Sequence, residues 1–260
     1  DLVRSRGLGD VYKRQGISWD NSNKEGLMYY GYGIDITYVF VIIGMLITLI
    51  ASWRMKATFK KYERVPSVSN LTGREVAERI LRANGIYDVS IRPIAGRLTD
   101  HYDPRDKTVS LSEAIYGSTS VAAIAVAAHE CGHAIQDNVG YVPLNLRSAF
   151  VPVANWGSKL AWPMIVIGLI LGYGNMSNLL IQIGIVMYMM AVAFQIITLP
   201  VEFDASRRAM VELKSNNILP SGEDSSARKV LFAAAMTYVA AAAAGVLQMI
   251  RLFLLFNGRG

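Results

Sequence analysis

The chain has 260 residues, of which 52% are hydrophobic and 18% are charged, and its mean hydropathy is +0.30. Soluble domains carry about a quarter charged residues, so this composition predicts a membrane protein with a modest polar part. The net charge of +6 fits the basic bias of cytoplasmic loops, and since no nucleic-acid-binding motif accompanies it, we expect no nucleic-acid partner. The single cysteine, Cys131, excludes an internal disulfide framework and a CxxC metal site.

The first residues, 1–15, are expected to be a sequencing-adaptor artefact. The stretch SRGLGDVYKRQ back-translates in one frame into a sequence that resembles a transposase-type adaptor. Without 1–15 the chain loses four basic and two acidic residues, so the net charge falls from +6 to +4. Residues 16–33 are expected to be a leader, within which Met28 is the predicted native start.

Residues 34–53, IDITYVFVIIGMLITLIASW, are predicted to form the first transmembrane helix. The run is apolar apart from Asp35, and about 20 residues are needed to span a bilayer. A buried helix of a soluble protein would show a polar stripe, which is missing here. The residues that follow include five cations: Arg54, Lys56, Lys60, Lys61 and Arg64. The positive-inside rule therefore places this end of the helix on the cytoplasmic side.

Residues 54–158 are predicted to form a cytoplasmic α+β domain. Thr72 and Glu75 have the spacing of a capping box at the start of a helix. The stretch VSIRPI is predicted to be a strand, and a turn at DPRD should join strands at Leu98–Tyr102 and Thr108–Leu111. Either of these last two strands could offer an edge to an extended substrate.

Three further apolar runs are predicted to lie in the membrane. Residues 159–199 contain two of them, separated by the short uncharged turn GYGNMSN, and should form a hairpin. The polar segment 200–229 should then meet the polar domain. The last run, 230–257, should span, although Gln248 and Arg251 leave an interfacial or protein-packed helix open. The predicted fold is mostly α, a multi-pass membrane protein with about four transmembrane helices.

The stretch AVAAHECGHAIQ carries two of the three histidines of the chain. On a helix, His129 and His133 lie one turn apart on the same face, where both imidazoles can bind one ion. Glu130 stands beside the first of them, in the position of the general base of HExxH metallopeptidases. The alternative is a pair of core histidines with no ion. A carboxylate in so apolar a helix needs a partner, which favours a metal.

A catalytic zinc needs a third protein ligand, for which three residues are candidates. Glu202 is preferred, because a carboxylate where the third span leaves the membrane costs free energy unless it is paired or binds a cation. Asp204 should point from another face of that helix and act outside the ligand shell or as an exposed charge. His101 either faces the cleft and stabilises the oxyanion of the attacked carbonyl, or is a surface histidine. Ser206, one turn after Glu202, could hydrogen-bond near the site.

Several stretches of the chain resemble the YugP-like neutral zinc metallopeptidases of bacteria. They are GRLTDHYDPRDKTVSLSE, AVAAHECGHAIQD, LRSAFVPVAN, TLPVEFDASRRA and AAAMTYVAAAAAGVLQMIRLF. The resemblance extends from about Met28 to the C-terminus and implies a membrane zinc peptidase with a zincin-like α+β catalytic domain. EFDAS also resembles the third-ligand helix of HtpX-like membrane gluzincins, whose zinc glutamate matches Glu202. Ser206 stands where that pattern carries an aspartate.

We therefore expect a membrane-bound zinc metallopeptidase with one catalytic Zn²⁺, ligated by His129, His133 and Glu202. Glu130 would take a proton from the zinc-activated water, and the site would lie at the cytoplasmic face of a bacterial inner membrane. Its partners would be the bilayer and protein or peptide substrates, including membrane proteins. The alternatives are a non-catalytic, zinc-containing membrane scaffold or adaptor and an intramembrane site-2-type protease. The apolar run before His129 is too short to span, which disfavours the latter.

Overall fold

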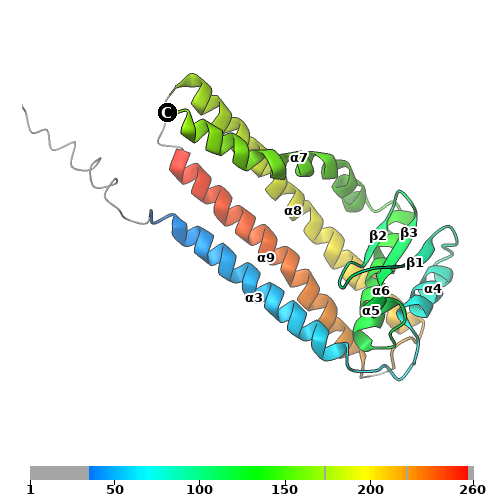
Figure 1. The fold of residues 1–260 in the computed structure, drawn as a ribbon. Coiled ribbons are helices and arrows are strands. Elements are labelled where there is room, and N and C mark those ends of the chain that lie inside the picture. Colours follow the sequence, from blue (N-terminus) through cyan, green and yellow to red (C-terminus); the bar gives the residue numbers. More distant parts are fainter. Residues whose placement is uncertain (1–34, 173, 221, 257–260) are drawn as a thin grey trace, which may run out of the picture. The chain divides into compact units, whose positions relative to one another are not determined.

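The computed structural model describes residues 35–172, 174–220 and 222–256 (Figure 1). From Val39 onward the chain packs as one unit. The adaptor-like segment 1–15 and the predicted leader 16–33, which includes Met28, lie outside the described residues.

Four long helices account for most of the described chain. They are α3 (Tyr38–Tyr62), α7 (Val142–Ile170), α8 (Asn175–Ser215) and α9 (Asp224–Phe256). Each is long and apolar enough to cross a membrane, judged by length and composition. Many of their large apolar side chains are exposed, as expected for surfaces that lipid covers. For the described part of the chain, the predicted mostly α, multi-pass membrane fold is confirmed.

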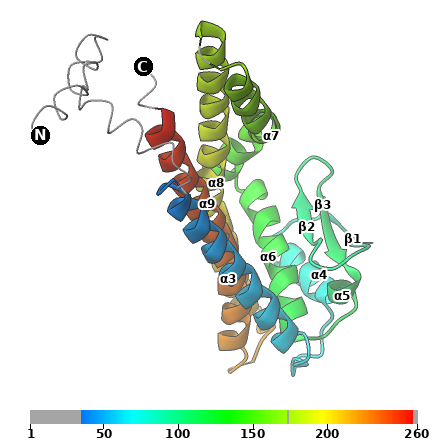
Figure 2. The ribbon, with the colours of Figure 1, turned by 60° about the vertical axis from the view of Figure 1, so that its left-hand side comes forward.

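Helices α7 and α8 form a hairpin whose two arms lie side by side (Figures 1 and 2). Glycines let the two backbones approach. A Cβ atom on Gly157 would lie 2.7 Å from the carbonyl oxygen of Met187, and one on Gly184 would lie 2.8 Å from that of Ala161. Small residues at helix contacts are typical of packing inside a membrane, where close backbone approach provides the attraction.

The helices extend beyond the predicted spans. Helix α3 continues past Trp53 to Tyr62 and so carries four of the five basic residues that follow the apolar run, while Arg64 lies just beyond it. Helix α8 passes through Pro200 without ending. A proline inside a helix removes one backbone hydrogen bond, but packing of α8 on α6, α7 and α9 holds the helix together. Glu202 is therefore carried on a direct continuation of the third span.

A small sheet has the order β1-β3-β2. Its strands are β1 (Ser90–Ile94), β2 (His101–Asp103) and β3 (Thr108–Ser112). Strands β2 and β3 form the predicted antiparallel hairpin, whereas β1 pairs with β3 in parallel. The prediction that Thr108–Leu111 could offer a free edge is wrong, because β3 lies in the centre of the sheet. Strand β2 is an edge strand.

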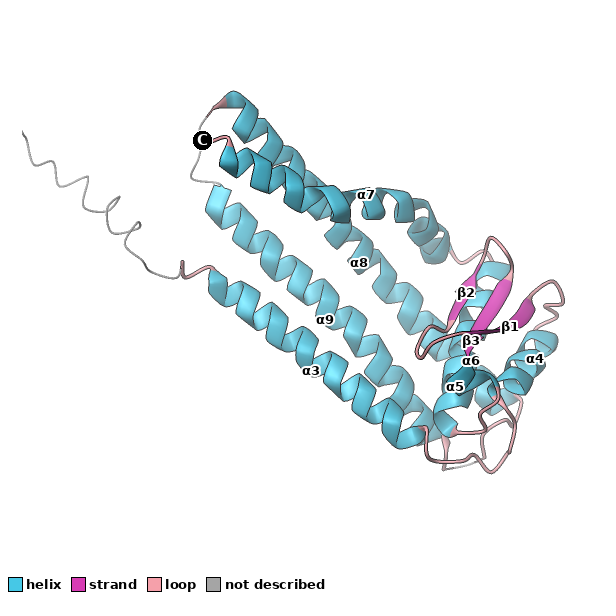
Figure 3. Cartoon of the chain, in the orientation of Figure 1, coloured by secondary structure: helices cyan, strands magenta, loops and turns pink. Residues whose placement is uncertain are grey.

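Helices α4 (Gly73–Ala83), α5 (Glu113–Tyr116) and α6 (Val121–Asn138) gather with the sheet at one end of the long helices (Figure 3). The predicted capping box of α4 is confirmed, since Thr72 and Glu75 exchange hydrogen bonds. Helix α6 is buried along most of its length and contacts α4, the sheet, α8 and α9. It thus joins the sheet to the membrane helices.

Candidate metal centre

Helix α6 presents His129 and His133 on one face. The centroids of their rings lie 4.8 Å apart, with the planes nearly perpendicular. Ser120 caps the helix, because its Oγ accepts a hydrogen bond from the backbone N–H of Ala123. The alanines that precede His129 are buried, so the helix can run through the middle of the fold. The helical spacing expected from the sequence is therefore present.

Helix α8 brings Glu202 to both histidines. The Oε2 atom of Glu202 lies 3.2 Å from Nε2 of His129 and 3.7 Å from Nε2 of His133. The residue is only 2% exposed. One ligand atom from each of the three residues lies within 4.8 Å of the other two. The structure thus brings together the three residues that the sequence predicts as metal ligands.

Gly132, inside the motif itself, lets α8 come this close. A Cβ atom at this position would lie 2.5 Å from the carbonyl oxygen of Ala205. Real Cβ atoms almost never come so near, so a larger residue would push the two helices apart. Cys131 faces the other way, towards α4, where its thiol contacts the carbonyl oxygen of Ala77.

The donor set fits zinc. Two imidazole nitrogens and one carboxylate are a common ligand set of catalytic zinc sites, which leave one position open. A carboxylate as buried as that of Glu202 costs free energy unless a cation lies beside it. The arrangement of Nε2, Nε2 and Oε2 around one point offers such a place.

Gln136 fixes the tautomer of His133. Its Oε1 lies 3.0 Å from Nδ1 of His133, while its Nε2 donates to the carbonyl oxygen of Val201 at 2.8 Å and to Asp204 at 3.0 Å. Because the amide nitrogen is committed to two acceptors, Oε1 must be the acceptor for His133. The Nδ1 atom of His133 therefore carries the proton, and the lone pair of Nε2 is free for a metal.

Asp204 holds Gln136 in place, because its carboxylate accepts a hydrogen bond from the Gln136 amide. Arg208 donates to it through Nε at 2.6 Å, and Arg207 pairs with the same carboxylate. Of the two expectations for Asp204, the structure favours a role outside the ligand shell over an exposed charge.

Ser206 takes a similar place beside His129. Its Oγ lies 3.2 Å from Nδ1 of His129. A hydroxyl can accept a hydrogen bond from Nδ1–H, as an aspartate would, although without a negative charge. Both predicted histidine ligands thus have a hydrogen-bond partner on the side away from Glu202.

Glu130 lines a cavity of about 330 Å³ that also reaches His129, His133 and Glu202. Burial raises the pKa of Glu130 to about 7, and the negative charge of Glu202 adds to the effect. His101, the first residue of β2, lines the same cavity and is exposed. Its Nδ1 lies 2.8 Å from the carbonyl oxygen of Thr99. The candidate base and the candidate oxyanion stabiliser therefore share one cavity.

A protein family described as "Putative neutral zinc metallopeptidase" matches residues 37–257. The chain belongs to this family. It is also 44% identical over 224 residues to "Putative membrane protease YugP" of Bacillus subtilis (strain 168), with 85% of this chain and 98% of that protein covered. No solved structure matches the chain significantly. The resemblance seen in the sequence and the zinc cofactor are thereby confirmed.

Three residues of the site in this zinc metallopeptidase family member were not predicted: Arg147, Tyr238 and Gln136. Arg147 of α7 places Nη1 3.6 Å from Oε1 of Glu202. Tyr238 of α9 lines the cavity together with the histidines. Both come from helices whose approach to α6 depends on tertiary packing, so no local pattern marks them. The contribution of Gln136 could have been read from its spacing, since it follows His133 by three residues on one helix.

Proposed function

We propose that this protein is a membrane-bound zinc endopeptidase of the HExxH type. His129, His133 and Glu202 hold the ion, and Glu130 is the general base. The observation that carries the proposal is the convergence of these three ligand atoms within 4.8 Å, beside a cavity that Glu130 also lines.

When bound, zinc would lower the pKa of a water molecule to about 7 and polarise the carbonyl of the scissile bond. The carboxylate of Glu130 accepts a proton from the attacking water and passes it to the nitrogen of the leaving amine. Arg147, paired with Glu202, holds that carboxylate towards the histidines.

The substrate would bind as an extended strand along β2. This strand lies at an edge of the sheet, and all three of its residues line the cavity. The hydroxyl of Tyr102 donates to Asp137 of α6 at 2.7 Å, which fixes the strand beside the metal centre. Backbone hydrogen bonds to an edge strand bind a peptide with little dependence on its sequence. His101 would then stabilise the carbonyl oxygen of the bound peptide as charge develops on it.

The site is proposed to lie at the cytoplasmic face. Basic residues at the end of α3 indicate that this end is cytoplasmic, and the segment 63–141, which carries the sheet and α6, begins there. Tyr87→Cys tests the orientation, because Tyr87 is 80% exposed and the single native cysteine, Cys131, is buried. A membrane-impermeant maleimide should label the variant in broken cells and leave it unlabelled in spheroplasts. Labelling in intact spheroplasts would reverse the assignment.

Glu130→Gln tests catalysis apart from metal binding. The amide keeps the shape of the side chain but cannot accept a proton, so cleavage should fall by about 10²–10⁴-fold. Zinc content, measured on the purified protein, should stay at the wild-type level. Cleavage is followed by mass spectrometry of a mixed peptide substrate incubated with each protein. Equal cleavage by wild type and variant would contradict the proposal.

The scaffold alternative is less well supported. A structural zinc usually has four protein ligands, whereas the metal-binding group found among the described residues has three. The intramembrane alternative requires the motif to lie on a spanning helix. Helix α6 is not one of the four spanning candidates in the part of the chain that the structure describes.

A further inference from the structure

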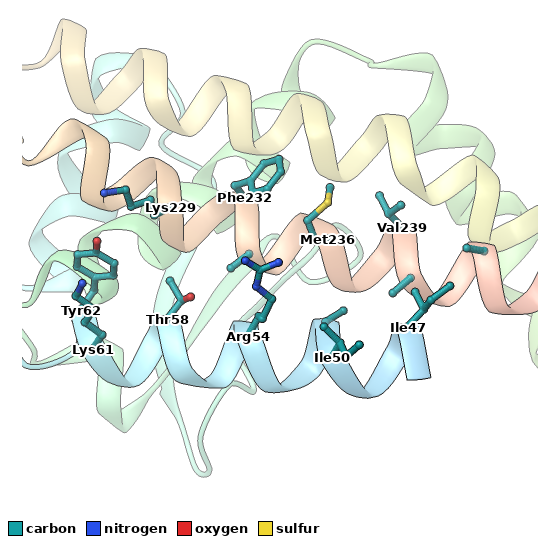
Figure 4. A pocket seen from close by; sticks show the side chains of 14 residues that line it. Ile47, Ile50, Arg54, Thr58, Lys61, Tyr62, Lys229, Phe232, Met236 and Val239 are labelled. Carbon is teal, nitrogen blue, oxygen red and sulfur yellow. The ribbon is translucent and has the colours of Figure 1, made fainter. Parts of the chain in front are cut away.

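A groove of about 630 Å³ lies between α3 and α9, on a part of the molecule separate from the metal centre (Figure 4). The two helices run in opposite directions (Figure 1). They touch near one end, where a Cβ atom on Gly44 would lie 3.2 Å from Cα of Ala244. Towards the other end Phe59 and Tyr62 of α3 are buried in the core. The groove occupies the stretch between these two contacts.

One end of the groove is basic. Lys61 of α3 and Lys229 of α9 line it beside Tyr62, and Arg54 of α3 lies further along, in the middle of the groove (Figure 4). In the part of the chain that the structure describes, no carboxylate forms an ion pair with any of these three cations. Three positive charges that line one groove without a carboxylate partner favour an anionic ligand.

The other end of the groove is apolar. Ile47 and Ile50 of α3 face Met236 and Val239 of α9 there (Figure 4). On both helices the change from basic to apolar falls at the edge of the hydrophobic run, at Arg54 on α3 and at Lys229 on α9. The headgroup region of a bilayer would begin in the part of the groove between Arg54 and Lys229.

From this pattern we propose that the groove is a binding site for an anionic phospholipid. The headgroup phosphate binds at Lys61 and Lys229, Arg54 lies between this end and the apolar end, and an acyl chain lies along the apolar end. A transmembrane helix of a partner would fill the apolar end but would leave the three cations without a counter-charge. The proposal does not depend on the peptidase activity, because none of the groove residues belongs to the metal centre.

The test is lipid binding by the purified full-length protein after delipidation in detergent, measured by native mass spectrometry. Phosphatidylglycerol is the probe. The variant Arg54→Gln/Lys61→Gln/Lys229→Gln should bind it roughly 100-fold more weakly, since each cation near an anionic headgroup contributes about a factor of five. Lys56→Gln/Lys60→Gln/Arg64→Gln is the matched control. It also removes three positive charges, in and just after α3, at exposed positions outside the groove.

Zinc content reports whether each variant keeps its fold, and only variants with the wild-type zinc content are compared. Selective loss of phosphatidylglycerol in the groove variant, with the control unchanged, supports the site. Equal binding by both variants overturns it. Binding of phosphatidylcholine as tight as that of phosphatidylglycerol would overturn the charge recognition. Displacement of the lipid by millimolar inorganic phosphate alone would assign the basic end to a free anion and overturn the lipid assignment.

Discussion

The contact between α6 and α8 and the contact between α3 and α9 both depend on a glycine, but they differ in how closely the helices pack. At Gly132 an added Cβ would meet the carbonyl oxygen of Ala205 at 2.5 Å, whereas at Gly44 it would meet Ala244 at 3.2 Å. The first contact continues into a buried network around the metal centre. The second leaves a groove of about 630 Å³. A metal centre requires ligands fixed to within a fraction of an ångström, while a lipid can fill an irregular space.

Of the changes at the contact between α6 and α8, loss of the proposed ligand Glu202 should lower zinc affinity the most. Glu202→Ala removes one of three proposed ligands, so zinc affinity should fall by at least about 100-fold, more than loss of a partner of a ligand usually costs. Competition with a fluorescent chelator measures this affinity. Glu78→Ala, which removes an exposed carboxylate paired with Arg82, should bind zinc like wild type. Unchanged zinc binding by Glu202→Ala would mean that α8 does not supply the third ligand.

A larger residue in place of Gly132 should push α6 and α8 apart, because Gly132 is where α6 contacts α8. Gly132→Ala places its methyl group against the Ala205 carbonyl, so α8 must shift, with an expected loss of about 1–3 kcal/mol in stability. Glu202 moves with α8, so zinc affinity should fall as well. Gly117→Ala is the control, because a Cβ at Gly117 would meet no atom within 4 Å. Thermal unfolding with and without zinc measures both effects. Equal behaviour of the two variants would show that the helices are not in close contact.

The network behind His133 should contribute less than a ligand. Gln136→Met keeps the size of the side chain but loses the acceptor for Nδ1–H and the donor to Asp204. We expect zinc affinity to fall by about 10–100-fold, as for other partners of metal-bound histidines. Asn138→Ala, an exposed position on the same helix, should leave zinc affinity unchanged. An unchanged affinity in Gln136→Met would remove Gln136 from the site.

The smallest effect is expected at Ser206. Because a neutral hydroxyl orients His129 more weakly than a carboxylate would, Ser206→Ala should lower zinc affinity by less than about 10-fold. Ser206→Asp should raise it, since a carboxylate at this position strengthens the imidazole as a ligand. Chelator competition distinguishes the two directions. A gain in Ser206→Ala, or a loss in Ser206→Asp, would contradict the assigned contact.

Local patterns in the sequence predicted the elements that local chemistry determines. The capping box at Thr72, the turn between β2 and β3 and the helical spacing of His129 and His133 each depend on neighbouring residues. Glu202 was predicted for a different reason, because a carboxylate at the end of an apolar run requires a cation. All of these features are present in the structure.

Features that depend on distant contacts were missed. The central place of β3 follows from its parallel pairing with β1, which no turn between them specifies. The passage of α8 through Pro200 depends on three neighbouring helices, whereas proline taken alone predicts a helix end. Arg147 and Tyr238 reach the metal centre only because α7 and α9 pack around it.

The location of zinc in the purified protein tests the account most directly. Anomalous diffraction at the zinc absorption edge should show one ion about 2.0–2.2 Å from Nε2 of His129, Nε2 of His133 and a carboxylate oxygen of Glu202. Zinc bound elsewhere, or bound without Glu202, would contradict it.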